Sequence, residues 1–380
     1  MIELAQIMRQ FAPAYLKKFG HRIPGIHQKA IHDIIDCRTP QMGGNTYYCD
    51  HCQTFHYSYH SCGNRNCNKC QNELAQQWLK KAEDLLLPVD HFMVTFTLPY
   101  QLRFLTRIHQ RLFYHLLMKC AAEALQTLAY DSNYVGGLLA MLAVIHTWGR
   151  DLSYHPHVHF IVAAGGLLEI ENIWLTSQAR YLVPVEALSI IFRAKFRDAL
   201  KKEDSDIFHT IDKSIWKQKW VVHSKSIGRG EHALKYLAQY IFRPAISNKR
   251  LLNLESGKVT FKYQESSTMR WKTMTLDAQE FIRRYLQHVL PKGFVKVRYY
   301  GLYSHRHRQT LEQLKKQMGE ANRQNHENTR QNKASKPLTC PHCGHILTFL
   351  SAMPKGSSWP KAPPPAYDLS GENKNERRYR

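Results

Sequence analysis

The chain has 380 residues, 43% of them hydrophobic, so it is long enough for two or three domains with buried cores. Its formal net charge of +23 makes a polyanion the expected partner, and nucleic acid is the first candidate. We expect no membrane association, because no apolar run approaches the roughly 18 residues of a spanning helix and the N-terminus lacks the apolar core of a signal peptide. The expected location is therefore the cytoplasm.

Taken in chain order, the hydrophobic pattern predicts mixed helices and strands, and hence the α+β class. Residues 1–36 are expected to form short helices, and residues 37–72 are dense in cysteine, histidine and asparagine. The elements predicted after them are helix 73–87, strand 91–99, helix 104–129, strands 142–148 and 155–163, helix 185–202, strand 219–225, helix 231–242, a hairpin of strands 259–265 and 270–276, and helix 278–290.

The composition changes after Ser304. Residues 304–339 are charged, rich in Gln and Asn and poor in apolar side chains, which predicts a partly helical linker. A small Cys-x-x-Cys knob at 340–345 follows, and the tail 346–380, rich in Pro, Ser and charge, is expected to be disordered. The predicted domains are thus an N-terminal helical segment 1–36, a cysteine-rich module 37–72 and a main domain 73–303, followed by the linker, the knob and the tail.

Two Cys-x-x-Cys pairs lie fourteen residues apart in the cysteine-rich module. Such pairs at this range are typical of a tetrahedral four-thiolate zinc site, which we favour over buried free cysteines. The predicted zinc ligands are Cys49, Cys52, Cys67 and Cys70.

Further cysteines leave additional metal sites open. Cys37 and Cys62 lie in the same module, with histidines nearby, and a second zinc ion there would need four ligands of its own. Cys340 and Cys343 supply only one pair, so a weak site, an intermolecular site and no site all remain open.

The loop before Cys70 also carries Arg65 and Lys69 among small polar residues. One interpretation is that these two cations contact a phosphate or a base edge of DNA. The alternative is a zinc staple that only rigidifies the fold.

The stretch HPHVHFIV, residues 155–162, places His155, His157 and His159 at alternate positions, and so on one face of a strand. Three interpretations are open: a core or solvated histidine strand, a histidine-triad nucleotide hydrolase, and a metal site formed by His157 and His159 that faces a scissile phosphate. Pro156 fits the second interpretation poorly. Neutral imidazoles suit Mn, Co, Ni or Zn, whereas Mg also needs oxygen ligands from the substrate.

The preceding strand supplies a third candidate ligand. If the two strands form an antiparallel hairpin centred near Asp151, then His146 lies opposite His157 and shares its face. A register slip of one residue would turn His146 to the other face.

The stretch EHALKYLAQYIFRP, residues 231–244, predicts a helix with a polar face that carries two phenols. At about 100° per residue, Tyr236, Tyr240 and Arg243 fall within one narrow arc, and the leucines fall on the opposite side. A tyrosine can attack a phosphodiester when its proton is removed and the phosphate is polarised. The alternative is a pair of aromatics at core spacing.

A His-hydrophobe-His strand followed by a Tyr-x-x-x-Tyr helix resembles the two-tyrosine HUH endonucleases. The cysteine motifs narrow the resemblance, because CRTPQMGGNTYYCDHC with SYHSCGNRNCNKCQ, then FTLPYQLR, HTWGRDLSYHPHVHFIV, LKYLAQYIFRPAIS and EFIRRYLQHVLPKGFVKVRYYGL look like the insertion-sequence-91 family of rolling-circle transposases. This resemblance covers about residues 5–303, with an echo at CPHCG. The sequence departs from the family at Asn45 and Asn66, where members often carry histidine.

The resemblance implies a ferredoxin-like HUH endonuclease domain with an antiparallel sheet, preceded by the zinc module, in a bacterial, nucleoid-associated protein. It implies that Tyr236 and Tyr240 are catalytic, that His157 and His159 hold a divalent metal such as Mg or Mn, and that the substrate is single-stranded DNA at element ends. A plasmid rolling-circle replication initiator or relaxase shares this chemistry and remains an alternative. A non-catalytic zinc DNA-binding regulator is the alternative from another class.

Overall fold

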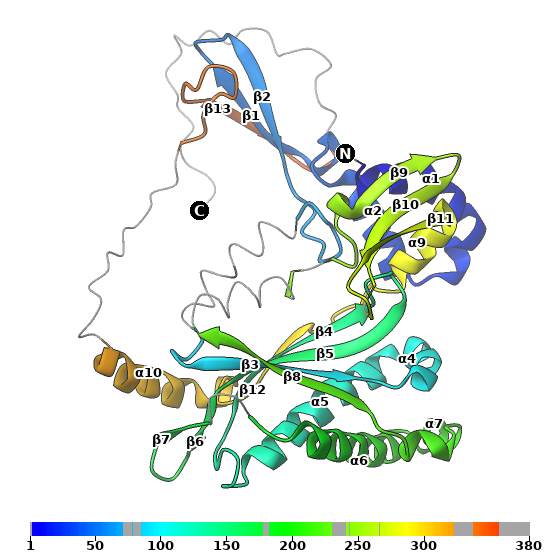
Figure 1. The fold of residues 1–380 in the computed structure, drawn as a ribbon. Coiled ribbons are helices and arrows are strands. Elements are labelled where there is room, and N and C mark those ends of the chain that lie inside the picture. The colour runs from blue at the N-terminus through cyan, green and yellow to red at the C-terminus, as the bar shows by residue number, and fades with distance from the viewer. Residues whose placement is uncertain are drawn as a thin grey trace. The chain divides into compact units, whose positions relative to one another are not determined.

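The computed structural model describes residues 2–70, 78, 85–177, 182–229, 241–242, 244–265, 267–322 and 337–356. The chain divides into two compact units (Figure 1). The larger unit combines Met1–Ile35 with Asn64–Thr329, and the smaller unit combines Asp36–Gly63 with Arg330–Arg380. The N-terminal helices belong to the unit that holds the main sheet, and Asp36–Gly63, most of the cysteine-rich module, belongs to the unit of the C-terminal segment.

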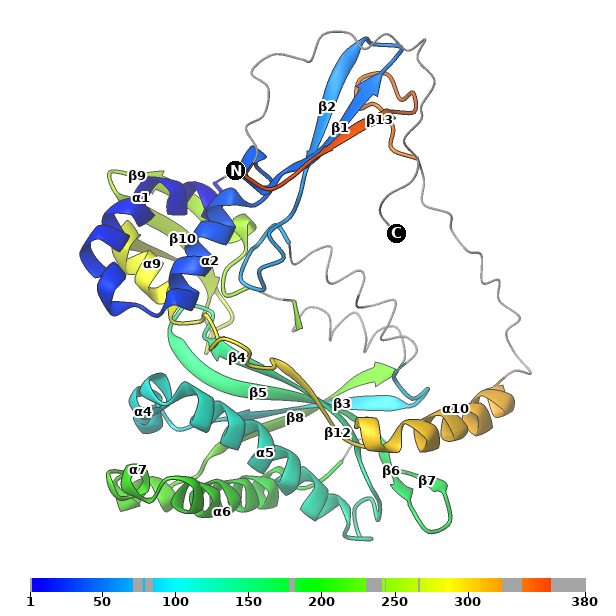
Figure 2. The same cartoon turned by 180° about the vertical axis from the view of Figure 1, so that it is seen from behind.

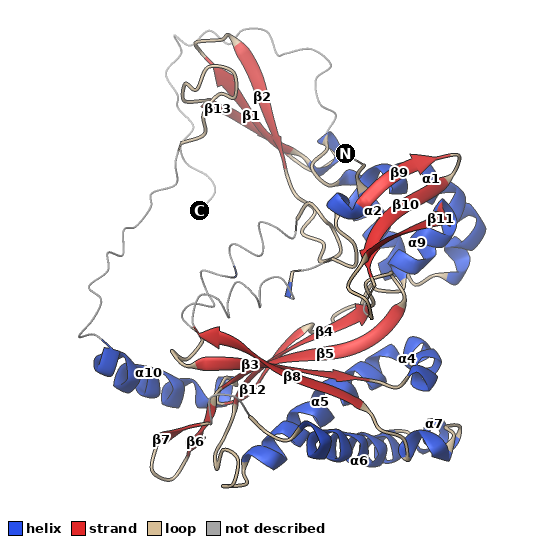
Figure 3. Ribbon diagram, in the orientation of Figure 1, coloured by secondary structure: helices blue, strands red, loops and turns tan. Residues whose placement is uncertain are grey.

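The larger unit is built on a five-stranded sheet in the order β12-β4-β5-β3-β8, in which every neighbouring pair is antiparallel. The predicted α+β class is confirmed (Figure 3). The strands are β3 (Asp90–Thr97), β4 (Ala140–Trp148), β5 (Tyr154–Ala163), β8 (Val221–Arg229) and β12 (Val297–Gly301).

Two long helices cover one face of this sheet (Figure 2). They are α5 (Gln110–Ala129) and α6 (Val185–Glu203), flanked by α4 (Arg103–Ile108) and α7 (Ser205–His209). The core between them is aromatic: Trp220 is fully buried, its ring centroid lies 5.3 Å from that of Phe192 and 5.4 Å from that of Phe196, and its Nε1 donates to the Ile215 carbonyl at 3.0 Å. The single helix predicted for 104–129 is two helices, because the backbone leaves the helical region at His109.

The opposite face of the sheet has its own apolar cluster, which includes Leu142, Val144 and Ile161. Helix α10 (Arg308–Asn322) packs there through Leu311 and Leu314. The predicted linker 304–339 therefore begins with an ordered helix, anchored by two of its few apolar residues. A short hairpin of β6 (Gly165–Leu168) and β7 (Ile173–Thr176) extends from the end of β5.

A second part of the larger unit consists of the N-terminal helices and a separate three-stranded sheet from residues 251–277. Helix α1 packs against α9, which ends before Pro291 and is shorter than the predicted helix 278–290. The elements are α1 (Leu4–Phe19), α2 (Gly25–Asp36), β9 (Leu251–Glu255), β10 (Lys258–Gln264), β11 (Trp271–Asp277) and α9 (Ala278–Leu286). The short 3-10 helices are η1 (Gly20–Arg22), η2 (Pro40–Met42), η3 (Tyr100–Leu102), η4 (Lys213–Trp216), η5 (Asn248–Arg250) and η6 (His305–His307).

The smaller unit contains a three-stranded antiparallel sheet in the order β13-β1-β2. Its strands are β1 (Gly44–Cys49), β2 (Thr54–Tyr59) and β13 (Thr348–Met353). Strand β13 corrects the prediction that the whole of 346–380 is disordered, because Thr348–Met353 pairs with β1 from Tyr48 to Gly44. Residues 357–380 lie outside the described residues.

Among the residues that the structure describes, none of the helices has the length and apolar character needed to cross a membrane.

Candidate functional site

Three histidines meet on the sheet face opposite helices α5 and α6. Strands β4 and β5 pair so that His146 faces His157 and Val144 faces His159, which is the predicted hairpin register. The three histidines, called the histidine cluster below, each offer a ring nitrogen, and these nitrogens lie within 4.8 Å of one another. The ring centroids of His157 and His159 are 4.7 Å apart, and those of His146 and His159 are 4.9 Å apart.

Neighbouring groups orient each ring of the histidine cluster. Nδ1 of His157 lies 2.7 Å from the His155 carbonyl oxygen and donates to it, so Nε2 is the nitrogen placed to hold a cation. Nδ1 of His159 lies 2.9 Å from Oγ1 of Thr95, and the His146 ring stacks on Trp148 at 4.6 Å. Fixed imidazoles of this kind are the usual support of a metal site.

His157 is in the protonation state that metal binding requires. Burial, followed by the charge of His155, lowers the pKa of His157 to about 4, so this imidazole is neutral at physiological pH. Imidazole nitrogens from three converging side chains fit Mn, Co, Ni or Zn, and fit Mg only if substrate oxygens complete the shell. The residues present therefore fit a divalent cation.

His155 does not join the histidine cluster, although the sequence places it on the same face. Its ring nitrogen contacts the guanidinium of Arg103 instead. Burial and the Arg103 charge lower the pKa of His155 to about 4. Its contribution to the cluster is the backbone carbonyl that fixes His157.

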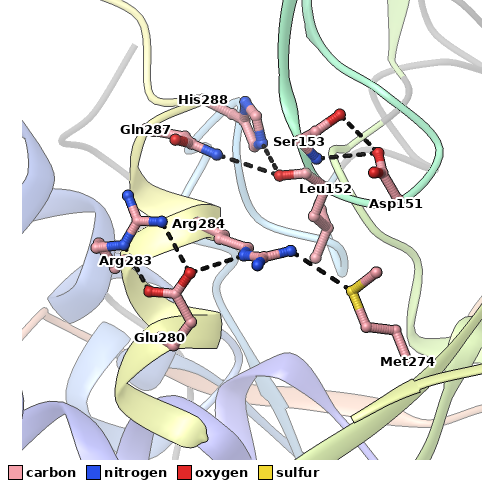
Figure 4. Close-up of polar contacts among 9 residues, drawn as sticks. All are labelled: Asp151, Leu152, Ser153, Met274, Glu280, Arg283, Arg284, Gln287 and His288. Carbon is pink, nitrogen blue, oxygen red and sulfur yellow. Dashed lines mark hydrogen bonds and ion pairs between the residues drawn. The ribbon is translucent and has the colours of Figure 1, made fainter. Parts of the chain in front are cut away.

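The turn between β4 and β5 is clamped from a distant helix end (Figure 4). Leu152 is fully buried and has a φ of +63°, a left-handed conformation that non-glycine residues adopt only under constraint. Its carbonyl accepts from Nε2 of Gln287 at 3.1 Å and from Nε2 of His288 at 3.3 Å, and Asp151 Oδ1 accepts from the Ser153 amide at 3.1 Å. These contacts hold the turn of the hairpin in which His146 lies opposite His157. Sequence reasoning missed Gln287 and His288, because nothing in helix 278–290 marks them as polar partners of a turn.

The predicted catalytic residues Tyr236 and Tyr240, and the predicted DNA-binding Arg243, lie outside the described residues. The residue after Tyr240 is described, and its burial shows which face of the sheet it packs against. Ile241 is buried in the same apolar cluster as Val144 and Ile161, and these two residues share the sheet face of the histidine cluster by strand alternation.

Lys296 links Ile241 to the sheet. Its Nζ donates to the Ile241 carbonyl at 2.7 Å and lies 5.4 Å from the centroid of the Trp148 ring, the same ring that stacks on His146. Burial, reinforced by the charge of Arg65, lowers the pKa of Lys296 to about 7. The sequence does not predict the burial of Lys296, because a single lysine before a strand is usually exposed to solvent.

Eight of the nine cysteines gather in two groups of four, each with Sγ atoms within 4.8 Å of one another. The first cysteine group is Cys37, Cys62, Cys67 and Cys70, and the second cysteine group is Cys49, Cys52, Cys340 and Cys343. This corrects the predicted partnership of Cys49 and Cys52 with Cys67 and Cys70. The physical reason is strand pairing: β1 ends at Cys49 and its neighbour is β13, so the turn before β13 lies beside the turn after β1.

Three cysteines of the first cysteine group are buried. Cys37 and Cys62 belong to the smaller unit, and Cys67 and Cys70 belong to the larger unit.

The remaining predicted DNA-contacting residues make contacts within the chain. Arg65 donates to the Phe294 carbonyl at 2.8 Å, and burial lowers its pKa. Lys69 forms an ion pair with Glu3 at 2.9 Å. A role for Arg65 or Lys69 in DNA binding stays a prediction.

Comparison with known proteins places these features in two matched regions. Residues 7–98 match the family described as "Transposase zinc-binding domain", and residues 140–333 match the family Y2_Tnp, described as "Putative transposase". The chain is 35% identical over 337 residues to "Putative transposase y4qJ" of Sinorhizobium fredii (strain NBRC 101917 / NGR234), which covers 83% of this chain and 84% of that protein. It is 28% identical over 300 residues to "Transposase for insertion sequence element IS801" of Pseudomonas savastanoi pv. phaseolicola, which covers 74% and 71%. No solved structure matches the chain.

Proposed function

Because this chain belongs to the IS91 family of transposases, we propose that it cuts and rejoins single-stranded DNA at the ends of its element, as in rolling-circle transposition. The observation that carries the proposal is the histidine cluster, which lies on the same sheet face that Ile241, the residue after Tyr240, packs against. In this proposal the main domain is an HUH endonuclease, and a zinc-stabilised module accompanies it.

His146, His157 and His159 hold a divalent cation, either Mn or Mg, in the proposed active site. When bound, such a cation supplies charge neutralisation and polarisation at the scissile phosphate. Thr95 and the His155 carbonyl keep the rings aimed, so the ligands need little rearrangement when DNA arrives.

The nucleophile is the phenol oxygen of Tyr236 or Tyr240. It bonds to the phosphorus while the bond to the 3′ oxygen breaks, and the net proton transfer is from the phenol to the departing 3′ oxygen. The products are a 5′-phosphotyrosine and a free 3′ hydroxyl. The phosphotyrosine retains the energy of the broken bond, so rejoining needs no ATP. Two tyrosines allow two successive strand transfers without release of the first 5′ end.

Lys296 supports this arrangement from the described part of the chain. Its hydrogen bond to the Ile241 carbonyl fastens the residue after Tyr240 to the sheet, and the Trp148 ring, which lies near Lys296, stacks on His146. We assign Lys296 a positioning role and no direct role in the chemistry.

We propose that positive charge on the protein supplies most of the binding of single-stranded DNA. The net charge of +23 supplies binding that is independent of sequence, and Arg243, Arg65 and Lys69 are the proposed local contacts.

The proposal is tested by incubating the protein with single-stranded oligonucleotides from the flanking DNA and Mn or Mg. We expect cleavage with the protein attached to the 5′ phosphate, in an adduct that survives denaturing gels and maps to Tyr236 or Tyr240. The double change Tyr236→Phe with Tyr240→Phe removes the adduct, whereas Tyr299→Phe, at an exposed tyrosine, does not. His157→Ala abolishes cleavage but leaves strand binding nearly intact, and the exposed His32→Ala is its control.

Other outcomes identify the rival functions. A replication initiator or relaxase makes the same adduct, but at a plasmid origin instead of an element end. A zinc-dependent regulator binds DNA and forms no adduct. A free 5′ phosphate from the unmodified protein refutes the tyrosine mechanism.

A further inference from the structure

We propose that the second cysteine group, Cys49, Cys52, Cys340 and Cys343, binds a zinc ion of its own, and that this ion fastens the C-terminal segment 337–356 to the β1–β2 hairpin. Cys340 and Cys343 lie beyond both matched regions, which end at residues 98 and 333. The site therefore adds a metal centre to the zinc-binding module and draws half of its ligands from the far end of the chain.

The spacing of the sulfurs matches zinc and excludes disulfides. The Sγ atoms of Cys49 and Cys343 are 3.5 Å apart, and those of Cys52 and Cys340 are 4.0 Å apart. These distances bracket the value of about 3.8 Å that follows from tetrahedral Zn–S bonds of about 2.3 Å. A disulfide requires about 2.05 Å, and all four cysteines are free.

Both Cys-x-x-Cys turns point backbone donors at a sulfur. The amide of Cys52 donates to Sγ of Cys49 at 3.4 Å, and the amides of His342 and Cys343 donate to Sγ of Cys340. Amide donors stabilise a thiolate, which is the form that binds a metal. Gly344, directly after the second pair, has a φ of +77° and donates to the Cys340 carbonyl at 2.8 Å, so a glycine stands where the turn needs left-handed backbone.

Histidines surround this site without replacing a cysteine. Nε2 of His56 lies 3.4 Å from Sγ of Cys340, within reach of a hydrogen bond that orients the thiolate. His51 and His345 stack at 4.1 Å and, with Cys343, form a competing set. That set has only three members and its histidines are exposed, whereas a structural zinc site has four closed ligands, so the four cysteines are favoured.

The proposed ion has a structural consequence for both ends of the chain. Strand β13 pairs with β1 from Tyr48 to Gly44, and the bound ion lies at the end of this pairing, where Cys49 finishes β1. Without the ion, no disulfide joins the two Cys-x-x-Cys pairs, and β13 is held to β1 by strand pairing and side-chain packing. The zinc is thus expected to decide whether β13 stays on the sheet.

Metal content tests the site in the full-length protein. Cys340→Ser with Cys343→Ser should hold one zinc ion per chain fewer than the unmodified protein. Cys120→Ser is the matched control, because Cys120 is buried in the core of α5 outside both groups, and it should keep the zinc content of the unmodified protein. Cys340→His should also keep that content, since zinc accepts three cysteines and one histidine.

A second readout follows the C-terminal segment itself. A site-specific protease sequence is inserted between residues 329 and 337, and the chain is cut after purification. The C-terminal fragment should stay bound to the remainder until a zinc chelator is added, and the double serine variant should release it without chelator. An unchanged zinc content in the double serine variant, a lower content in Cys340→His, or a fragment that stays bound after zinc removal would each overturn the proposal.

Discussion

Replacing Lys296 with methionine should stabilise the fold and weaken DNA cleavage at the same time. The residue is only half-buried, but its ammonium is enclosed between the Ile241 carbonyl and the Trp148 ring, and burial lowers its pKa from 10.5 to about 7. Methionine keeps the unbranched stem and removes the charge. It therefore removes the cost of burying an ammonium, together with the hydrogen bond to Ile241.

The magnitude follows from these two opposing terms. A pKa lowered from 10.5 to about 7 corresponds to a burial cost of about 5 kcal/mol for the charged form. The lost hydrogen bond from a charged donor offsets about 1.5–3 kcal/mol of that gain. The free energy of unfolding of the Lys296→Met protein should thus exceed that of the unmodified protein by about 2–3.5 kcal/mol at pH 6.

The sign of the pH dependence makes the reasoning testable. Below pH 7 the ammonium is charged in the folded and the unfolded chain, and the whole burial cost is present. Between pH 7 and 10.5 the folded protein releases the proton first, so the unmodified protein gains stability as the pH rises and the advantage of methionine shrinks by up to about 1.4 kcal/mol per pH unit. Urea unfolding at pH 6, 7, 8 and 9, followed by tryptophan fluorescence, measures this trend.

Cleavage of single-stranded DNA should fall in the same variant, because Ile241, the residue after Tyr240, loses its hydrogen bond to Lys296. Lys292→Met, at an exposed lysine on the same segment, should change neither property. A stability difference that is independent of pH, or a Lys296→Met protein that is less stable at pH 6, would refute the account of Lys296.

Trp220→Ala should lower the free energy of unfolding of the larger unit by about 3–5 kcal/mol in urea unfolding, because it empties the space beside Phe192 and Phe196, and a loss below about 1 kcal/mol would contradict this packing. Thr95→Val should raise the Mn concentration needed for half-maximal cleavage about 10–100-fold with unchanged zinc content, and an unchanged Mn requirement would show that Thr95 does not orient His159. Burial lowers the pKa of each of five histidines to about 4 or about 3, so the unfolded chain binds more protons than the folded chain below pH 6.5. The free energy of unfolding should therefore fall as the pH drops from 6.5 towards 4, and a free energy of unfolding that does not change over this range would contradict the burial of neutral histidines. These are His27, His91, His155, His157 and His288. Affinity for single-stranded DNA should fall steeply with salt in a filter-binding titration, and a salt-independent affinity would argue against charge-driven binding.

The histidine cluster was predictable because its geometry is local. Two strands joined by a short turn leave few registers, and counting outward from Asp151 places His146 opposite His157 as the structure does. The contact of His155 with Arg103 could not be predicted, because alternation gives the face of a side chain but not its partner, and Arg103 comes from a different element.

The grouping of the cysteines was not predictable from spacing. Cys49 and Cys52 have a nearer pair along the sequence, and their real neighbours are brought by β13, a strand formed in a segment whose composition resembles a disordered tail. The burial of Lys296 could not be predicted for a related reason. It depends on Ile241 and Trp148, which contact Lys296 only in the folded chain.

The clamp on the β4–β5 turn ties the timing of site assembly to the direction of protein synthesis. Leu152 emerges from the ribosome long before Gln287, which follows 135 residues later, and the left-handed turn lacks its two side-chain donors until His288 has also been made. A nascent chain, or one truncated before α9, carries all three histidines of the cluster but lacks the two donors that hold the Leu152 carbonyl. The left-handed turn is then left to contacts within the hairpin, such as that of Asp151 with the Ser153 amide. An interrupted copy of the gene thus yields a protein whose histidine cluster has lost the long-range support of its turn.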